Sequence, residues 1–253
     1  FYLSKNFNVK CIDNFSTSKK NNIIKLKNFK NFELITHDII KKIDIVSDIY
    51  INLASPASPF QYQVDPVKTF KTNIIGSINV LDLAKKYKSK VFQASTSEIY
   101  GDPLQHPQSE TYFGNTNPIG LRSCYDESKR AAETLFIDYN RMYKTKIKIA
   151  RIFNTYGPNM LKNDGRVISN FINQSIRNKN ITIYGDGSQT RSFCFIDDLV
   201  FGIDKLIMSK NTITGPINLG NDQELKIIDL ANLIIKLTNS DSKIIFKKLP
   251  SDD

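Results

Sequence analysis

Residues 90–101 of the chain read KVFQASTSEIYG. The first part, Lys90 to Ala94, is rich in apolar residues and predicts a β-strand. The strand ends in a group of polar side chains, Ser95 to Glu98. Similar short apolar runs occur on both sides of it, at Val9 to Ile12, Phe32 to Ile35, Ile49 to Leu53 and Ile147 to Phe153.

Two long segments with helical spacing separate these runs, Thr69 to Tyr87 and Tyr125 to Tyr143. Strands that alternate with helices predict an α/β fold with a parallel sheet, because each crossover returns the chain to the same edge. Parallel sheets bind ligands at the carboxyl ends of their strands. Asp13, Asp38 and Ser95 to Glu98 all fall at such ends.

The sequence changes character after residue 155. The helical and strand-like pieces become shorter and the loops longer, as at Gly157-Pro158 and Gly185 to Gly187, before a further helix at Ile227 to Thr238. We therefore predict that residues 1–155 carry the sheet. Residues 156–253 are expected to form mostly a smaller C-terminal lobe that closes over the substrate.

Composition excludes several classes of protein. The 253 residues are 40% hydrophobic, enough for a sizeable core, and no apolar run reaches the length of a membrane-spanning helix. The three cysteines, Cys11, Cys124 and Cys194, form no pattern that predicts a disulfide framework or a metal site. The net charge of +10 comes mainly from Lys, which favours a solvated basic surface over a nucleic-acid groove. We expect no nucleic-acid partner, no membrane and no metal.

Tyr125 and Lys129 carry the strongest chemical signal. They lie at positions i and i+4 of a predicted helix and therefore share one face. An ammonium near a phenol favours the phenolate, so we expect Lys129 to lower the Tyr125 pKa from its ordinary value of about 10. Such a Tyr can take a proton from a substrate hydroxyl while a cofactor takes a hydride. The pair alone is weak, because this spacing is common on any helix.

The polar group that ends the strand at Ala94 strengthens this prediction. Thr96 and Ser97 offer hydroxyls that can hold a substrate hydroxyl in line with Tyr125, and Glu98 places a carboxylate beside them. The alternative is that these hydroxyls only satisfy backbone groups at the strand end. The presence of both segments in one chain favours a catalytic role over this structural one.

The chain resembles the extended short-chain dehydrogenase/reductase family of sugar-nucleotide epimerases and dehydratases, and within it the UDP-glucuronate decarboxylases. The strings that carry the resemblance span nearly the whole chain. They are Asp13 to Phe15, His37-Asp38, Leu53 to Pro59, Lys71 to Asn73, Ser95 to Pro103, His106 to Glu110, Asn117 to Gly120, Ala150 to Thr155, Asn163 to Val167, Tyr184-Gly185 and Gly187 to Arg191.

The resemblance implies a Rossmann-like doubly wound parallel sheet, with NAD as the cofactor and a UDP-sugar as the substrate. The implied reaction is NAD-dependent decarboxylation of UDP-glucuronate to UDP-xylose. Tyr125 would take the C4 hydroxyl proton while hydride goes to NAD, and the 4-keto sugar, a β-keto acid, would then lose carbon dioxide before the hydride returns.

The resemblance also assigns roles to residues. The catalytic group is Tyr125, Lys129, Thr96, Ser97 and Glu98. The residues assigned to the cofactor are Asp13, Asn14, Thr17, Asp38, Ile39, Leu53, Ser55, Thr72, Tyr125, Lys129 and Thr155. Those assigned to the nucleotide-sugar or its border with the cofactor are Lys71, Asn79, Tyr139, Asn154, Arg166, Tyr184 and Arg191.

Some of these residues have plainer alternatives. Asp13 could cap the turn that follows it. Arg166 and Arg191 could be surface charges. If they bind the substrate, their planar guanidinium groups suit paired hydrogen bonds to phosphate or carboxylate oxygens.

One departure from the family concerns the ends of the chain. The family has a Gly-rich turn where the cofactor pyrophosphate meets a helix N-terminus, whereas residues 1–75 contain no glycine. We expect that both ends are truncated and that residues 1–253 alone are inactive. The resemblance implies a homodimer through the long helices, and we expect a cytoplasmic protein.

Sister activities are the alternatives. A 4,6-dehydratase is expected to carry Thr-Asp-Glu where this chain has Thr96, Ser97 and Glu98, and a 4-epimerase usually lacks the Glu. A UDP-glucuronate 4-epimerase or an oxidative decarboxylase stays open. A non-catalytic binding module is a remote alternative, which salt-dependent DNA binding without turnover would favour.

Overall fold

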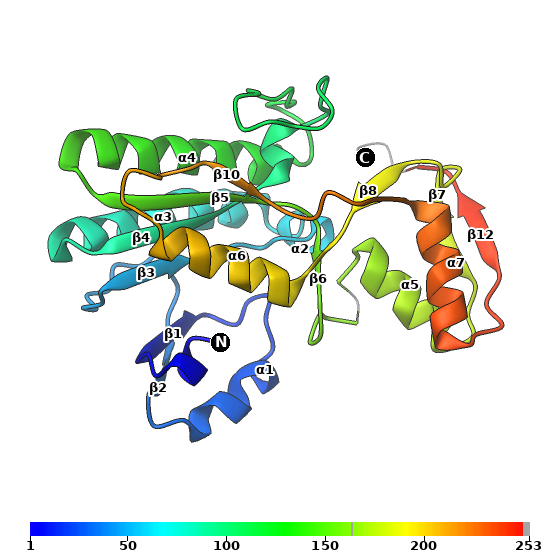
Figure 1. Ribbon diagram of the computed structural model, residues 1–253, viewed down its shortest axis with the longest axis horizontal. Coiled ribbons are helices and arrows are strands. Elements are labelled where there is room, and N and C mark those ends of the chain that lie inside the picture. The colour runs from blue at the N-terminus through cyan, green and yellow to red at the C-terminus, as the bar shows by residue number, and fades with distance from the viewer. Residues whose placement is uncertain (163, 250–253) are drawn as a thin grey trace.

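A four-stranded parallel sheet forms the centre of the computed structural model, which describes residues 1–162 and 164–249 (Figure 1). Its strand order is β10-β5-β4-β3. The strands are β3 (Ile49–Asn52), β4 (Lys90–Thr96), β5 (Lys146–Ile152) and β10 (Ile217–Leu219). Asn163, which belongs to one of the family strings, lies outside the described residues, as do Pro250 to Asp253.

A second parallel pair, β1 (Val9–Asp13) and β2 (Phe32–Thr36), precedes this sheet. Their register runs from Val9 opposite Phe32 to Asp13 opposite Thr36, so both strands end at the same edge. The short helices η1 (Leu3–Lys5), α1 (Asn21–Ile24) and η2 (Lys25–Asn28) flank the pair. Within the described ranges β1 and β2 form a sheet separate from the four strands. The predicted parallel strands are thus present in two groups.

Helices cover both faces of the central sheet because its strands present apolar side chains on both sides. On one face α3 (Pro66–Tyr87) and α4 (Ser123–Tyr143) lie side by side. On the other face lies α6 (Ile196–Met208) (Figure 1). Alternate residues of one strand enter different cores, since Val91 packs with α3 and α4 and Phe92 packs with α6. This confirms the predicted doubly wound, Rossmann-like α/β fold.

The C-terminal part has a core of its own, formed where helices α5 and α7 pack on a parallel strand pair, β7 and β12. Two further pairs, β8–β11 and β6–β9, connect it to the rest of the chain. The elements are α5 (Val167–Ser175), α7 (Ile227–Thr238), β6 (Thr155–Tyr156), β7 (Ile181–Tyr184), β8 (Thr190–Ser192), β9 (Cys194–Phe195), β11 (Glu224–Lys226) and β12 (Ile244–Lys247).

The chain crosses between the two parts more than once. After β9 it returns to the first part, where α6 packs on the sheet and β10 pairs with β5. The predicted second lobe is therefore not one continuous stretch after residue 155, because Ile196 to Leu219 belong to the sheet and its covering layer.

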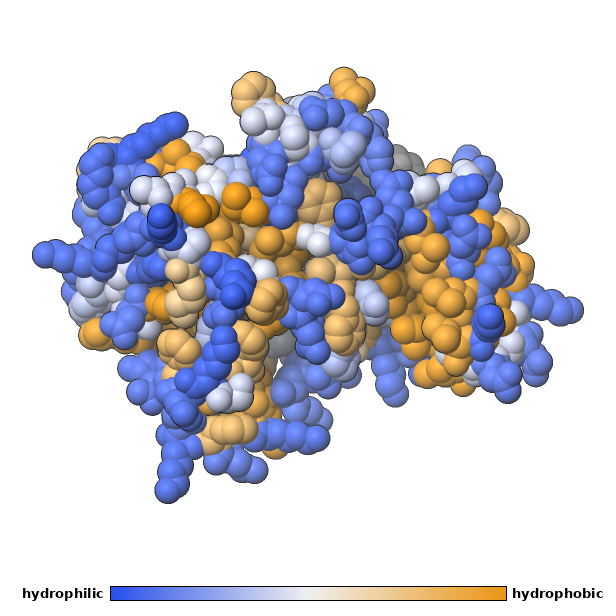
Figure 2. Space-filling view, in the orientation of Figure 1, coloured by the Kyte–Doolittle hydropathy of each residue, from blue (hydrophilic) through white to orange (hydrophobic). Residues whose placement is uncertain are grey.

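Apolar side chains gather on the outer side of the C-terminal part, over α7 and β12 (Figure 2). They include Leu233, Leu237 and Phe246, all exposed. A contiguous apolar surface of this kind typically contacts another polypeptide segment. No helix within the described ranges is both long and apolar enough to cross a membrane.

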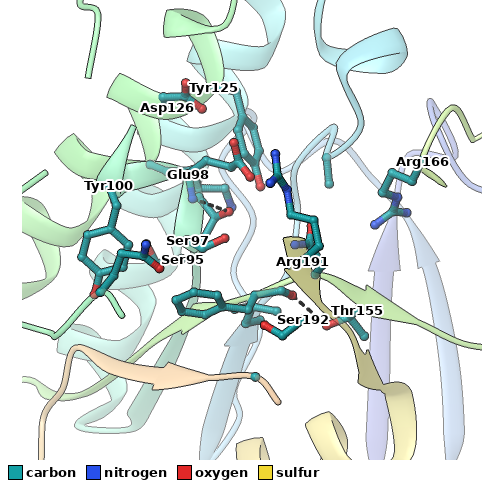
Figure 3. Close-up of a pocket in the computed structure, with 18 of the residues that line it drawn as sticks. Ser95, Ser97, Glu98, Tyr100, Tyr125, Asp126, Thr155, Arg166, Arg191 and Ser192 are labelled. Carbon is teal, nitrogen blue, oxygen red and sulfur yellow. Dashed lines mark hydrogen bonds between the residues drawn. The ribbon is translucent and has the colours of Figure 1, made fainter. Parts of the chain in front are cut away.

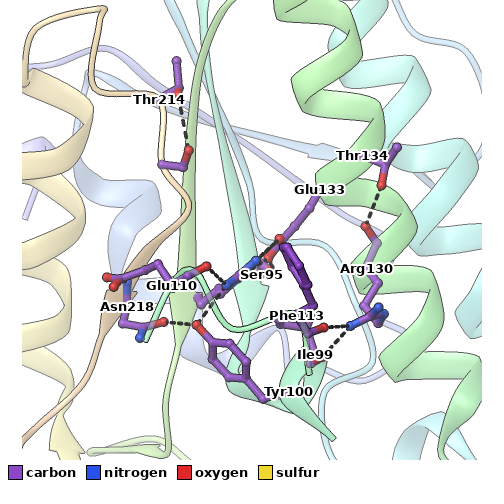
Figure 4. Close-up of polar contacts among 12 residues, drawn as sticks. Ser95, Ile99, Tyr100, Glu110, Phe113, Arg130, Glu133, Thr134, Thr214 and Asn218 are labelled. Carbon is purple, nitrogen blue, oxygen red and sulfur yellow. Dashed lines mark hydrogen bonds and ion pairs between the residues drawn. The ribbon is translucent and has the colours of Figure 1, made fainter. Parts of the chain in front are cut away.

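A buried polar network fixes the carboxyl end of the sheet (Figure 4). Arg151 on β5 donates hydrogen bonds from two side-chain nitrogens to the Glu133 carboxylate on α4. Both side chains are about nine-tenths buried. Glu133 also accepts from Ser95 Oγ at 2.5 Å, and Arg151 donates to Tyr100 Oη at 2.9 Å. The hydroxyl of Tyr100 in turn donates to Asn218 on β10. Charges and hydroxyls from four elements thus meet where β4 and β5 end.

This network predicts a large difference between single and double substitutions. Arg151→Met should lower the free energy of unfolding by about 3–5 kcal/mol, since it leaves the Glu133 carboxylate buried without its cation. The double variant Arg151→Met/Glu133→Leu should recover most of that loss. Urea unfolding measures both. The control is Lys86→Met, which removes the exposed pair with Asp44 and should change stability by less than about 1 kcal/mol. Equal effects of Arg151→Met and Lys86→Met would contradict this account.

Candidate active site

A cleft of about 1810 Å³ opens at the carboxyl ends of β4 and β5 and extends to the C-terminal part. Its volume exceeds the range of about 300–1,000 Å³ that is usual for one small ligand, so it has room for a cofactor and a substrate together. Both parts of the chain line it, and Figure 3 shows Tyr125 and Glu98 on one side with Arg166 and Arg191 on the other.

The predicted catalytic group is brought together at this cleft. Thr96 ends β4, and its hydroxyl accepts a hydrogen bond from the backbone N–H of Glu98 at 3.2 Å, which caps the short helix η3 (Ser97–Tyr100). Helix α4 presents Tyr125 and Lys129 to the same cleft, one turn apart. All five predicted catalytic residues line the cleft, although they come from segments about thirty residues apart.

Lys129 is held by the strand itself. Its Nζ donates a hydrogen bond to the backbone oxygen of Ala94 at 2.9 Å and lies 5.7 Å from the centre of the Tyr125 ring. The side chain is almost completely buried. Burial disfavours the charged amine and lowers the pKa of Lys129 to about 8.

The pKa of Tyr125 differs from the sequence-based expectation. Burial raises it to about 12, because the phenolate is poorly solvated there. A hydrogen bond with Thr96 and the charge of Arg166 favour the phenolate, whereas the carboxylates of Glu98 and Asp126 disfavour it. The expected lowering by Lys129 is therefore wrong for this structure, in which desolvation is the largest effect.

Arg122 is a member of the site that the sequence analysis did not identify. It precedes α4, and its guanidinium forms an ion pair with Glu98. Its Nε also lies 4.0 Å from the carboxylate of Asp126. The spacing held a signal, because Arg122 is three residues before Tyr125 and so lies near the same helical face. Glu98 thus faces the cleft with a cation beside it.

The opposite wall carries residues predicted to contact the nucleotide-sugar. Arg166, at the start of α5, pairs with the buried carboxylate of Asp164, with one hydrogen bond at 2.9 Å. Arg191 on β8 is exposed and donates to the backbone oxygen of Thr190. Asn154 also lines the cleft, as do the cofactor candidates Leu53, Ser55 and Thr155.

Several residues predicted to contact the cofactor gather at the ends of β1 and β2. Asn14 donates to Asp38 at 2.9 Å, and the Asp13 carboxylate accepts from the Phe15 N–H and from Ser18. The backbone oxygen of Ile39 accepts from Asn79. Asn79, predicted at the substrate side or its border with the cofactor, thus lies with the cofactor candidates. The backbone oxygen of Thr17 accepts a long hydrogen bond, at 3.5 Å, from Gln61.

Ten predicted residues lie outside the residues that line the cleft. Six of them are those just described near β1 and β2, and the other four are Lys71, Thr72, Tyr139 and Tyr184. Tyr139 donates its hydroxyl to Asp82 across the contact of α3 and α4, and Thr72 donates to Lys68 within α3. Lys71 is exposed on α3, and Tyr184 is exposed on β7. Their binding roles stay predictions. In the part of the chain that the structure describes, no cluster of His, Cys, Asp and Glu could hold a metal ion.

A known protein family matches most of the chain. Residues 1–220 match the NAD dependent epimerase/dehydratase family. The chain belongs to this family. The UDP-glucuronic acid decarboxylase 4 of Arabidopsis thaliana is 49% identical over 99% of the chain, and the UDP-glucuronic acid decarboxylase 1 of Xenopus tropicalis is 48% identical over 97%. The chain spans 56% and 58% of these two relatives.

A solved structure shares the architecture. The UDP-glucuronic acid 4-epimerase of Bacillus cereus, in complex with UDP-glucuronic acid and NAD, superposes with a TM-score of 0.85 at 29% identity. The match covers 98% of this chain and 81% of the epimerase. This agreement extends through both parts of the chain.

The depressed pKa of Lys129 predicts a pH-dependent gain in stability on its removal. The unfolded Lys has a pKa of about 10.4, so the folded state disfavours the ammonium fully below about pH 8 and the penalty fades as pH rises towards 10.4. Removal of the amine relieves this penalty but also removes a hydrogen bond that contributes about 1 kcal/mol. With that contribution subtracted, Lys129→Met should raise the free energy of unfolding by about 2 kcal/mol at pH 7.

Chemical denaturation at pH 7 and near pH 10 measures this difference. The gain should shrink at the higher pH, while the exposed control Lys236→Met should show no such trend. A loss of stability in Lys129→Met that is the same at both pH values would contradict the burial penalty.

Proposed function

We propose that the protein converts UDP-glucuronate to UDP-xylose and carbon dioxide through a 4-keto intermediate, with NAD as a cofactor that is regenerated. The observation that carries this proposal is the assembly of Thr96, Ser97 and Glu98 with Tyr125 and Lys129 in one cleft. The relatives named UDP-glucuronic acid decarboxylase, nearly half identical over almost the whole chain, support the choice of reaction.

The side chains that would hold NAD suit its chemical groups. Lys129 has three N–H donors and uses one on Ala94 within the described residues, so two can meet the hydroxyls of a ribose. Asp13 ends a parallel strand, where an acid commonly accepts the ribose hydroxyls of NAD. Each of its oxygens accepts one hydrogen bond and retains capacity for another. A bound NAD would supply the hydride acceptor and return the hydride at the end.

Tyr125 would take the proton from the C4 hydroxyl of the sugar. Its raised pKa keeps the phenol neutral at rest, so it must first release its own proton to solvent. Nearby cations favour the phenolate that then accepts the C4 proton. Arg166 favours it, and Lys129 lies beside the ring. The hydroxyls of Thr96 and Ser97 would hold the sugar in line.

Decarboxylation then follows from the substrate. The 4-keto sugar is a β-keto acid, so the bond from C5 to the carboxylate breaks and its electron pair moves to the C4 carbonyl. The resulting enolate takes a proton at C5. Return of the hydride to C4, with the proton of Tyr125 to the C4 oxygen, completes UDP-xylose. Glu98, paired with Arg122, would face the reacting carbons as part of the catalytic group.

Arg166 and Arg191 would bind the anionic groups of the UDP-sugar. They come from α5 and β8, so both belong to the C-terminal part. Their guanidinium groups can form charged hydrogen bonds with phosphate or carboxylate oxygens. The substrate would thus join the two walls of the cleft.

UDP-glucuronate 4-epimerase activity is the second candidate. The structural similarity to the epimerase of Bacillus cereus favours it, because that protein binds the same sugar nucleotide. The two reactions share the first oxidation and separate at the carboxylate. Analysis of the product distinguishes them, since an epimerase retains the carboxyl carbon.

We also propose that the protein is a homodimer that works in the cytoplasm. Helix α3 exposes a stripe of apolar residues, Val67, Phe70 and Ile75, which would pack against a second copy. The three cysteines are free, which suits a reducing compartment. No role in binding nucleic acid or membrane follows from the site.

Substitution of Tyr125 tests the proposed chemistry. Tyr125→Phe in the full-length protein should lower kcat at least about a hundredfold, because the phenol is lost while the ring and its packing remain. The KM for UDP-glucuronate should change little. Mass spectrometry of UDP-xylose formed from UDP-glucuronate and NAD measures the rate. The control is Tyr87→Phe, which removes an exposed hydroxyl at the end of α3. Near-normal turnover by Tyr125→Phe would overturn the assignment.

A further inference from the structure

Tyr62 packs face to face on Tyr125. The ring centres lie 5.1 Å apart and the ring planes differ by 7°. Tyr62 is 1% exposed and Tyr125 is 7% exposed, so solvent does not separate the two rings. One of the two faces of the Tyr125 ring is therefore covered by a flat aromatic surface. This surface limits rotation of the Tyr125 side chain about its Cα–Cβ bond.

The segment that carries Tyr62 is fastened on two sides. Tyr62 ends the short helix α2 (Pro59–Tyr62), which follows β3 and precedes α3. Its backbone oxygen accepts from the Thr69 hydroxyl on α3 at 3.2 Å and from the Cys124 thiol on α4 at 3.8 Å. Cys124 is the residue next to Tyr125. The Tyr62 backbone is thus bound beside the backbone that carries the catalytic phenol.

Tyr62 contacts Tyr125 through its aromatic ring and not through its hydroxyl. The hydroxyl oxygen is buried and has no hydrogen-bond partner among the residues that the structure describes. An unpaired buried hydroxyl opposes folding. Burial also raises the pKa of Tyr62, so the group stays a neutral phenol. Tyr62 therefore serves this site through its aromatic surface.

We propose that Tyr62 is a positioning residue that fixes the plane of the Tyr125 ring, and thereby the direction of its hydroxyl towards the sugar. The inference rests on the proposed function, in which Tyr125 moves the C4 proton. A catalytic group has to be held within about 0.5 Å and 10–20° of its working geometry. The stacked ring supplies this restraint on the side of Tyr125 that faces α2.

Two variants at position 62 separate the ring from the hydroxyl. Tyr62→Phe keeps the ring, so kcat for UDP-xylose formation should stay within about threefold of the wild type, and the melting temperature should be equal or higher. Tyr62→Leu removes the ring, and kcat should fall by about tenfold to a hundredfold with little change in KM, because misplacement of a reacting group by about 1 Å has an effect of this size.

A second stacked pair gives a matched control. Tyr112 stacks on Tyr100, not on Tyr125, with ring centres 6.0 Å apart and an interplanar angle of 13°. Tyr112→Leu removes a stacked ring of the same kind, and its kcat should fall less than about threefold. If Tyr62→Phe loses as much activity as Tyr62→Leu, or if Tyr112→Leu loses as much, the positioning role is overturned.

A measurement without turnover tests the stacking directly. The protein is labelled with 3-fluorotyrosine, and the fluorine resonance of Tyr125 is assigned by its loss in Tyr125→Phe. Tyr62→Leu should shift this resonance and broaden it, since the ring loses its restraint, whereas Tyr62→Phe should leave it nearly unchanged. An unshifted resonance in Tyr62→Leu overturns the inference. Absence of UDP-xylose formation by the wild type would instead overturn the proposed function, so the two failures are distinguishable.

Discussion

The hydrogen bond from Lys129 Nζ to the Ala94 backbone oxygen is the interaction on which the site depends. It joins helix α4 to the carboxyl end of β4, two segments 35 residues apart in the sequence. It also buries an amine whose charge is disfavoured there, which lowers its pKa to about 8. Because α4 is fixed at this point, Tyr125, one turn earlier, lies beside Thr96 and Glu98 on the same side of the cleft. A buried Lys of this kind favours function at the expense of stability.

The sequence alone predicted the parts of the structure that depend on local pattern. The strand from Lys90 to Ala94 and the long helices follow from apolar periodicity, and the parallel sheet follows from their alternation. That these side chains meet at one cleft could be predicted because Ser95 to Glu98 end a strand and Tyr125 and Lys129 share a helical face. Parallel strands bring such ends to one edge, so position along the chain determines position in space.

Other features depend on contacts between distant segments and could not be predicted in this way. The stacking of Tyr62 on Tyr125 has no signal in the spacing, because it depends on how α2 packs against α4. The raised pKa of Tyr125 reflects the depth of burial, which a helical wheel does not give. The return of α6 and β10 to the sheet depends on long-range pairing with β5. For the same reason several residues assigned by resemblance, such as Tyr139, lie outside the cleft.

The central claim is that one cleft oxidises C4, releases the carboxyl carbon and returns the same hydride. UDP-glucuronate labelled with ¹³C at C6 and deuterium at C4 tests all three steps in one incubation with the full-length protein and NAD. The account predicts that the ¹³C appears as carbon dioxide and that the UDP-xylose retains deuterium at C4. Retention of the ¹³C in a UDP-sugar product, or loss of the deuterium to solvent, would contradict it.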